Sequence, residues 1–201
     1  LLLGVGGGDV RPPWIDRAGD GPAFLVGGPP RPGKSSVLCA LATQFITRGI
    51  AVILVAPKKS PLADMAHVAG VRRAFLGADA ESIEFEDCLD ATPFVVLVDD
   101  ADLVDTANES LIEVASRRTG DAALIVAGTT EFLRSSSYKS FVADARKSRC
   151  GMLLCPESSF DGQMLSLSLP RGTAITGPPG RGFLGVGGEH TLVQAAVADS
   201  E

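Results

Sequence analysis

The segment at residues 28–35 combines residue types that bind phosphate groups. It reads GPPRPGKS and fits the pattern G-x-x-x-x-G-K-[ST]. An apolar stretch precedes it and a helical pattern follows, which is the context that this pattern requires. Consecutive backbone N–H groups and a helix N-terminus then form a positively polarised nest for phosphate oxygens. The expected nucleotide-binding residues of this loop are Gly28, Pro29, Pro30, Arg31, Pro32, Gly33, Lys34, Ser35 and Ser36.

Three residues of this loop have distinct expected roles. Lys34 is expected to reach the outer phosphates, and the Ser35 hydroxyl is expected to bind Mg²⁺, which makes ATP and Mg²⁺ the expected cofactors. Pro32 has no N–H, so one donor of the nest is missing and ATP binding should be weakened by about 1.5–3 kcal/mol. The alternative interpretation is a Gly/Pro turn that only caps a helix.

A pair of acidic residues follows another apolar run. Residues 94–100 read FVVLVDD, the pattern of a Walker B strand. Asp99 is then expected to hold the Mg²⁺ shell, and Asp100 to orient the attacking water as the catalytic base. Many ATPases carry Glu at the second position, and the shorter Asp100 predicts slow or absent hydrolysis, since misplacement by about 1 Å can cost about 10²-fold in rate. The alternative is a solvated acid pair or helix cap at a strand end.

Other polar residues leave two interpretations open. Thr129 and Thr130 follow the apolar run 122–127 and suit either a γ-phosphate contact or a helix N-cap. Arg146 and Arg149 suit either an arginine finger for a neighbouring domain or a favourable charge at a helix C-terminus.

Short apolar runs at regular spacing predict the strands that position these residues. The runs Ala23–Val26, Ala51–Ala56, Phe94–Val98 and Ala122–Ala127 are too short for helices and lack strict alternation, as expected for strands buried on both faces. Helical spacing follows Gly33, and further helices are indicated around Leu111–Ala115 and Phe141–Ala145. Short antiparallel strands are predicted at Leu165–Leu169, Thr173–Thr176, Phe183–Val186 and Thr191–Val193, and a short strand at Leu1–Val5. A turn is predicted around Pro178–Gly180.

This alternation predicts an α/β fold with a mainly parallel central sheet, helices on both faces and antiparallel strands at the C-terminal end. The 201 residues favour a single domain. A net charge of −6 argues against a dedicated nucleic-acid module. No apolar run is long enough to span a bilayer, no signal peptide is recognisable, and the chain is interpreted as a piece of a longer protein. The four cysteines form no C-x-x-C pair and are interpreted as buried thiols.

The chain resembles FtsK/SpoIIIE-type P-loop ATPases, and in particular the C-terminal ATPase module of EccC-like type VII secretion ATPases. The Walker-type segments are shared by many P-loop proteins, whereas the C-terminal series of matches is more specific. The matching segments are GVGGGD (4–9), GPAFLVGGPPRPGKSS (21–36), APKKSPL (56–62), VLVDDADL (96–103), Ala127–Gly128, SRCGMLLCP (148–156), LPR (169–171) and GPPGRGFL (177–184).

The resemblance implies a P-loop NTPase fold of the ASCE class, within its FtsK/HerA branch, over residues 1–201. It implies a module at the C-terminal end of a longer protein that is tethered to the cell membrane, on its cytoplasmic side, and that carries several ATPase domains. Such proteins form rings that move DNA or folded export substrates. In the secretion branch this module can recognise a signal at the C-terminus of an exported helical protein pair. Pro32 stands where the family often has Ser, and Asp100 replaces its Glu.

Three functions therefore remain open at this point. The first is an ATP-binding module of a type VII secretion motor that acts in substrate docking, assembly or regulation. The second is an FtsK-like DNA translocase module, which the acidic composition disfavours. The third is a degenerate P-loop domain that binds no nucleotide and serves as an interaction domain.

Overall fold

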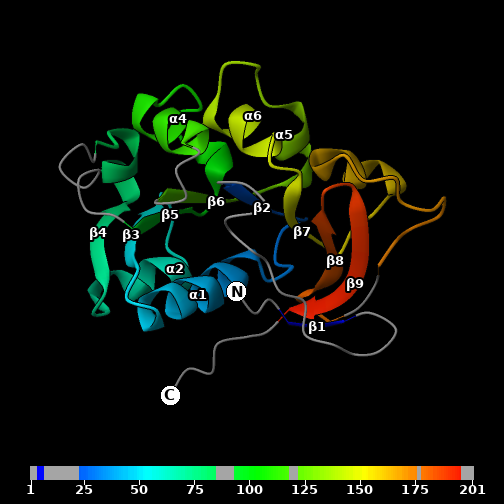
Figure 1. The fold of residues 1–201 in the computed structure, drawn as a ribbon, viewed down its shortest axis with the longest axis horizontal. Coiled ribbons are helices and arrows are strands. Elements are labelled where there is room, and N and C mark those ends of the chain that lie inside the picture. The colour runs from blue at the N-terminus through cyan, green and yellow to red at the C-terminus, as the bar shows by residue number, and fades with distance from the viewer. Residues whose placement is uncertain (1–3, 7–22, 85–92, 118–121, 176–177, 196–201) are drawn as a thin grey trace.

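A computed structural model describes residues 4–6, 23–84, 93–117, 122–175 and 178–195. These residues form a nine-stranded sheet in the order β1-β9-β8-β7-β2-β6-β5-β3-β4 (Figure 1). Strands β7, β2, β6, β5, β3 and β4 are parallel, whereas β8, β9 and β1 add an antiparallel edge. The strands are β1 (Gly4–Gly6), β2 (Ala23–Gly27), β3 (Ala51–Ala56), β4 (Val71–Leu76), β5 (Phe94–Val98), β6 (Ala122–Gly128), β7 (Cys150–Leu154), β8 (Arg181–Val186) and β9 (Glu189–Ala195).

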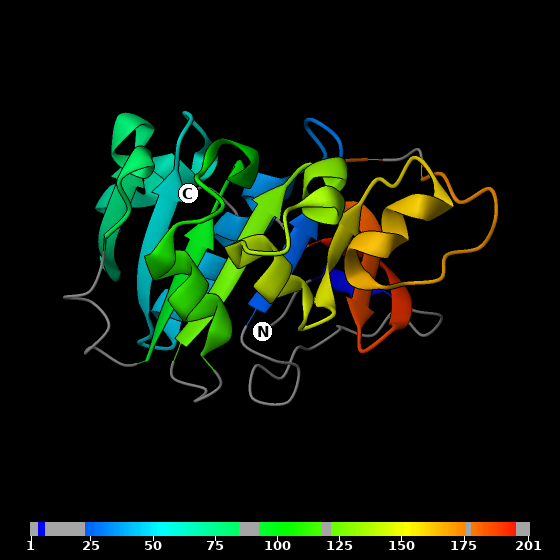
Figure 2. The same ribbon diagram turned by 90° about the horizontal axis from the view of Figure 1, so that it is seen from above.

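Helices cover both faces of this sheet (Figures 1 and 2). Helices α1 and α2 lie on one face, and α4, α5 and α6 lie on the other. Their bounds are α1 (Lys34–Thr47), α2 (Pro61–Asp64), α4 (Glu109–Ser116), α5 (Thr130–Ser135) and α6 (Phe141–Arg146). Short 3-10 helices are η1 (Met65–His67), η2 (Gly77–Glu81), η3 (Ala101–Leu103) and η4 (Ser159–Leu165).

The central strands are apolar throughout because both of their faces are buried. In β3, Val52 and Leu54 belong to the cluster that packs under α1, whereas Ile53 and Val55 belong to the cluster under α4 and α6. A strand with side chains on two covered faces cannot alternate with polar residues. The four predicted apolar runs are therefore confirmed as β2, β3, β5 and β6. The predicted α/β fold with antiparallel strands at its C-terminal end is also confirmed.

Helix α1 follows directly from the residues after the glycine-rich loop. Val37, Leu41 and Phe45 recur at helical spacing and are buried against the sheet. The chain then turns at Gly49, where the φ of +71° favours glycine. The helix places its N-terminus, with its free N–H groups, at the end of β2.

Two predicted C-terminal strands are wrong. Leu165–Leu169 alternates as a strand would, and its three leucines are buried, but Ser166 has a φ of +58° and ends η4. These leucines fill the core from an irregular segment that pairs with no described strand. Thr173–Ile175 also forms no strand, and Thr176 lies outside the described residues. Of the predicted strand Leu1–Val5, the described part confirms β1 from Gly4 onward.

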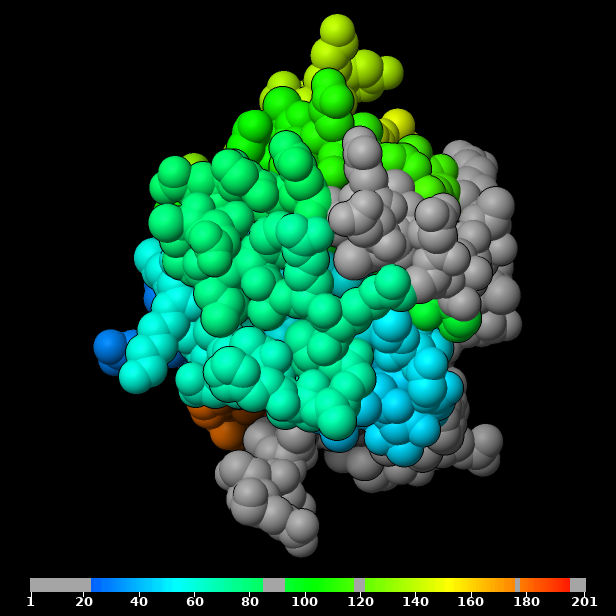
Figure 3. All heavy atoms as spheres, turned by 90° about the vertical axis from the view of Figure 1, so that its left-hand side faces the viewer, coloured from blue at the N-terminus to red at the C-terminus, as the bar shows by residue number. Residues whose placement is uncertain are grey.

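Strands β4 and β7 have no counterpart among the predicted strands. Strand β4 is an edge of the described sheet, and its two exposed arginines, Arg72 and Arg73, interrupt the apolar run. The Arg73 guanidinium lies 4.9 Å from the centre of the Phe75 ring. Figure 3 looks onto this edge, where the segments from β3 to η2 form most of the visible surface. Within the described residues, no helix is both long and apolar enough to cross a membrane.

Candidate functional site

Three neighbouring strands end where the predicted phosphate-site residues lie. Strands β2, β6 and β5 are adjacent and parallel, so their carboxyl ends meet at one edge of the sheet. The loop 28–35 follows β2, Thr129 follows β6, and Asp99 follows β5. The carboxyl edge of a parallel sheet is the usual place for a ligand site in an α/β protein. The structure therefore brings together segments that are far apart in the sequence.

The backbone of the loop explains its glycines. Gly33 has a φ of +96°, which strongly favours glycine, and it precedes the first residue of α1. A Cβ on Gly28 would lie 2.8 Å from the carbonyl oxygen of Leu154 in β7. Glycine at position 28 thus lets the loop pass close to the neighbouring strand. Arg31 also has a positive φ, of +63°, and its side chain is exposed.

Lys34 is held inside this loop. Its ammonium donates hydrogen bonds to the carbonyl oxygens of Gly28 at 3.2 Å and Pro29 at 2.8 Å, and the residue is only 8% exposed. Burial lowers the pKa of Lys34, while the charges of Asp100, Asp99 and Asp102 oppose that shift. The carboxylates that follow β5 therefore lie close enough to Lys34 for their charges to act on it. Its loop contacts are the ones that a phosphate would have to replace.

Asp99 is the most buried charged residue of the site. It is 1% exposed, its Oδ1 accepts a hydrogen bond from the Asp100 N–H at 3.1 Å, and its own N–H donates to the Val55 carbonyl in β3. Its Oδ2 is buried without a hydrogen-bond partner among the described residues. Burying a carboxylate oxygen without a partner destabilises the folded state, unless a cation or a hydrogen-bond donor binds to that oxygen.

Asp100 differs from Asp99 in exposure and backbone geometry. It is half-buried, and its backbone lies in the left-handed α region, with a φ of +45°. Burial raises the pKa of Asp100, and the neighbouring carboxylates of Asp99 and Asp102 raise it further, whereas Lys58 and Lys34 lower it. An acid with a raised pKa beside a buried carboxylate is a typical arrangement in active sites.

The remaining candidates near the loop have local roles that the structure defines. Ser35 and Ser36 lie in the first turn of α1 and are half-buried. Thr129 is the N-cap of α5, because its Oγ1 accepts a hydrogen bond from the Phe132 N–H. Thr129 directly follows β6, and β6 lies between β2, which leads into the loop, and β5, which precedes Asp99.

Arg146 is engaged within the chain. Its guanidinium donates to the carbonyl oxygens of Leu133 and Arg134, at the C-terminal end of α5. This contact supports the interpretation of Arg146 as a helix-end charge. Arg149 has a φ of +48° in the turn that leads into β7.

The described cysteines are not joined in disulfides. Cys39, Cys150 and Cys155 form no disulfide, and Cys88 lies outside the described residues. Burial raises the pKa of the Cys39 thiol to about 11, helped by the charges of Asp99 and Asp64. Cys39 therefore stays protonated at neutral pH. In the described part of the chain, no three His, Cys, Asp or Glu side chains are grouped so that they could hold a metal by themselves.

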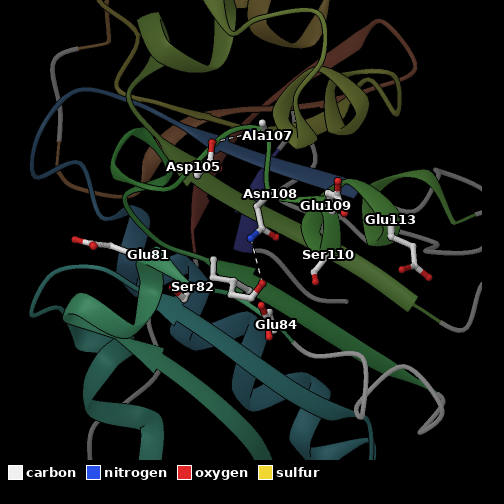
Figure 4. A pocket seen from close by; sticks show the side chains of 10 residues that line it. Glu81, Ser82, Glu84, Asp105, Ala107, Asn108, Glu109, Ser110 and Glu113 are labelled. Atoms are coloured by element: carbon white, nitrogen blue, oxygen red, sulfur yellow. Dashed lines mark hydrogen bonds between the residues drawn. The ribbon is translucent and has the colours of Figure 1, made fainter.

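Away from these residues, a recess lies between η2 and the start of α4 (Figure 4). Its volume is about 460 Å³, and five carboxylates line it, from Glu81, Glu84, Asp105, Glu109 and Glu113. The Asn108 carboxamide joins its walls, donating to the Ile83 carbonyl and accepting from the Leu111 N–H. This recess contains none of the phosphate-site residues. Its negative charge disfavours a nucleotide, so the edge at β2, β6 and β5 is the better candidate site.

One contact of the phosphate loop was not predicted from the sequence. The Gly180 N–H donates to the Pro32 carbonyl at 2.7 Å, so the turn at Pro178–Arg181 lies directly on the loop (Figure 2). The residues Pro-Pro-Gly indicated the turn itself, but no local pattern indicates which distant segment a turn contacts.

The sequence matches no protein-family profile and no curated protein. Its structure nevertheless superposes on ATPases 2 and 3 of Thermomonospora curvata EccC, solved in complex with a signal sequence peptide, with a TM-score of 0.72 and 20% identity over 100% of this chain. EssC ATPases 2 and 3 from Geobacillus thermodenitrificans match with a TM-score of 0.73 and 19% identity over 98% of this chain. This chain spans 41% of the length of each of these two proteins.

A more distant match is a single NTPase domain. The genome packaging NTPase B204 from Sulfolobus turreted icosahedral virus 2, in complex with ATP-gammaS, matches with a TM-score of 0.58 and 12% identity, over 90% of this chain and 100% of its own. These superpositions show that the chain has the P-loop ATPase fold, as the sequence predicted. At this level of identity they establish the fold, and the activity has to be argued from the site.

Proposed function

We propose that this chain is an ATP- and Mg²⁺-binding module of a type VII secretion motor of the EccC and EssC kind. The observation that carries the proposal is the convergence of Lys34, Asp99 and Asp100 at the carboxyl edge of β2, β6 and β5. A buried ammonium in a glycine-rich loop, with two carboxylates at the end of a nearby strand, is the arrangement that binds a nucleotide phosphate with a divalent cation.

The loop would bind the phosphates of ATP through its backbone. The residues other than proline between Gly28 and Ser36 would supply N–H groups, with the start of α1 adding its positive end. The Lys34 ammonium would exchange the carbonyls of Gly28 and Pro29 for phosphate oxygens. That exchange replaces neutral acceptors by charged ones and is therefore favourable.

Two residues fit a magnesium ion at this site. The Asp99 Oδ2 is buried with no hydrogen-bond partner among the described residues, and Ser35 lies one residue after Lys34 at the start of α1. Carboxylate and hydroxyl oxygens, together with phosphate oxygens and water, are the ligands that Mg²⁺ prefers. When bound, Mg²⁺ would neutralise phosphate charge.

Hydrolysis by this module is proposed to be weak. Pro32 removes one N–H from the loop, and Asp100 is one methylene shorter than the glutamate expected for a base that orients water. The left-handed backbone at Asp100 further limits where its carboxylate can reach. The module would then bind ATP chiefly for substrate docking, assembly or regulation.

The surroundings of the module are proposed from its structural relatives. The T. curvata EccC structure comprises ATPases 2 and 3 in complex with a signal sequence peptide. By analogy, this chain would work beside other ATPase domains of the same polypeptide, in a ring on the cytoplasmic side of the membrane to which the whole protein is tethered. Its export partner would carry a signal at the C-terminus of a helical protein pair, whereas DNA is the less favoured substrate for a chain of net charge −6.

The first test is a calorimetric titration of Mg-ATP into the parent, Lys34→Ala and Lys139→Ala. Lys139 is an exposed lysine in the connection between α5 and α6 and is the matched control. Binding should weaken at least about tenfold in Lys34→Ala, since it loses a charge-assisted contact, and should be unchanged in Lys139→Ala. No binding by the parent at millimolar ATP would favour the degenerate interaction domain. DNA binding that falls steeply with salt would favour the translocase.

The second test concerns hydrolysis. Asp100→Glu should raise ATP turnover by about tenfold or more if the short side chain limits the reaction. Steady-state phosphate release would be measured for the parent, for Asp100→Glu and for the double variant Lys34→Ala/Asp100→Glu. Unchanged turnover in Asp100→Glu would mean that another part of the catalytic machinery is missing.

A further inference from the structure

The segment Pro178–Arg181 forms a tight turn whose geometry follows from its residues. The Arg181 N–H donates to the Pro178 carbonyl, Pro179 occupies the second position, and Gly180 has a φ of +87° at the third. These features define a type II turn, which needs glycine where φ is positive. Gly180 is buried although both prolines of the turn are exposed.

This turn contacts the phosphate loop at one peptide group. The Gly180 N–H donates to the Pro32 carbonyl at 2.7 Å, and a Cβ on Gly33 would lie 3.3 Å from the Gly180 nitrogen. In a trans peptide the carbonyl and the following N–H point in opposite directions. Holding the Pro32 carbonyl on the turn therefore points the Gly33 N–H away from the turn. That N–H donates no backbone hydrogen bond to the described residues.

The segment Pro178–Arg181 is also hydrogen-bonded to the antiparallel edge of the sheet. The Ala195 N–H donates to the Gly180 carbonyl at 2.7 Å, and the Gln194 side-chain amide donates to the Pro179 carbonyl at 2.9 Å. Gln194 and Ala195 belong to β9, and Ala195 pairs with Gly4 of β1. A series of hydrogen bonds thus runs from the phosphate loop through the turn to the edge strands.

We propose that the Pro178–Arg181 turn is a positioning element of the phosphate site, which aims the Gly33 N–H at a phosphate oxygen and links the loop to β9 and β1. The inference rests on the proposed nucleotide binding and deepens it. Because Pro32 contributes no N–H, the direction of the next N–H matters more here than in a loop with a full set of donors. Displacement of β9 would change the affinity of the loop for nucleotide.

Gly180→Ala tests this inference, with Gly172→Ala as the matched control. A Cβ at position 180 would lie 2.9 Å from the Gln194 side-chain nitrogen, so this amide must move from its place on the Pro179 carbonyl. The φ of +87° also strains any side chain at position 180, so the substitution disturbs the turn itself. Gly172 also has a positive φ, of +76°, but a Cβ there meets nothing within 4 Å. Both variants carry similar backbone strain, and only Gly180→Ala places that strain in the turn that contacts the loop.

The readouts separate positioning from stability. Gly180→Ala should weaken Mg-ATP binding at least about tenfold, the equivalent of one misaligned charge-assisted hydrogen bond, while Gly172→Ala stays within about twofold of the parent. Both should lower the urea midpoint by comparable amounts. The amide NMR signal of Gly33 without nucleotide should move in Gly180→Ala and not in Gly172→Ala.

Gln194→Ala provides a second variant should Gly180→Ala fail to fold. It removes only the side-chain anchor on Pro179, and binding should weaken about two- to threefold, with a smaller shift of the Gly33 signal. Parent-like Mg-ATP affinity in the folded Gly180→Ala protein would overturn the inference and leave the proposed function intact. A parent whose binding is absent, or does not depend on Lys34, would overturn both.

Discussion

Strands β6 and β5 are followed directly by Thr129 and Asp99, and β2 leads through the loop to Lys34, whereas β8 and β9 carry no candidate catalytic side chain. The antiparallel strands instead hold the turn that contacts the Pro32 carbonyl. In the proposed function, the parallel region supplies the charged groups of the phosphate site, and the antiparallel region aligns its backbone. The comparison shows how an edge of the sheet that contributes no charge can still contact a candidate phosphate loop.

The two regions meet at β7, and glycines make that junction possible. A Cβ on Gly151 would lie 2.4 Å from the Leu25 carbonyl oxygen in β2, and one on Gly182 would lie 2.1 Å from the Leu153 carbonyl oxygen. Gly182 pairs with Leu154 across β7 and β8. These backbones approach too closely for any side chain at positions 151 and 182.

The largest expected effect comes from separating the two regions at this junction. Gly182→Ala should lower the free energy of unfolding by about 3 kcal/mol or more, because its methyl group meets neighbouring backbone that cannot move aside. Urea denaturation measures the change. Gly128→Ala is the control, since its Cβ would meet side chains only at 3.4 Å, an ordinary contact distance. Equal losses in the two variants would show that the close approach of β7 and β8 is not a strict requirement.

A smaller effect is expected from restoring a donor to the parallel region. Pro32→Ser adds an N–H to the loop and should tighten Mg-ATP binding about tenfold, equivalent to about 1.4 kcal/mol. Calorimetry would compare it with Pro170→Ser, which replaces an exposed proline outside the loop. Equal affinity in the parent and Pro32→Ser would mean that position 32 faces no phosphate oxygen.

The smallest effect concerns the stability of the acid pair and its dependence on pH. The raised pKa of Asp100 means that its charged form is disfavoured in the folded state. Asp100→Asn should therefore be more stable than the parent at pH 7, without nucleotide. The gain should shrink as the pH falls through the raised pKa and vanish below the ordinary value of about 3.9, where both folded and unfolded forms are protonated.

Thermal unfolding from pH 8 to pH 3.5 would measure this difference. Asp105→Asn is a matched control, because Asp105 lies outside the phosphate site and lines the recess between η2 and α4. A gain for Asp100→Asn that persists unchanged at pH 3.5 would mean that the effect is not one of charge.

The parallel part of the fold could be predicted because burial on both faces leaves a direct trace in the sequence. Strands β3 and β5 begin and end at the predicted residues. Strands β2 and β6 each extend one residue beyond the prediction, to Gly27 and Gly128. Strand β4 could not be predicted in this way, since Arg72 and Arg73 are exposed at an edge. The alternation of Leu165, Leu167 and Leu169 led to a wrong strand prediction, because alternate residues of an irregular segment can also be buried without pairing to a strand.

The candidate site was predictable in its residues and not in its supporting contacts. The pattern of the loop identified Lys34, and the apolar run before Asp99 identified the carboxylates. Their meeting at one edge followed from parallel strands. The hydrogen bond between Gly180 and Pro32 joins backbone atoms far apart in the chain, and backbone contacts of this kind leave no residue signature.

The arginines of β4 have a consequence beyond the architecture of the sheet. An edge strand presents unpaired N–H and C=O groups that invite strands of other molecules, and charged side chains on such an edge oppose that pairing. Arg72 and Arg73 are both exposed, and the Arg73 guanidinium covers the ring of Phe75. Two copies brought together along β4 would face each other with like charges. The two arginines therefore oppose aggregation through this edge of the described sheet.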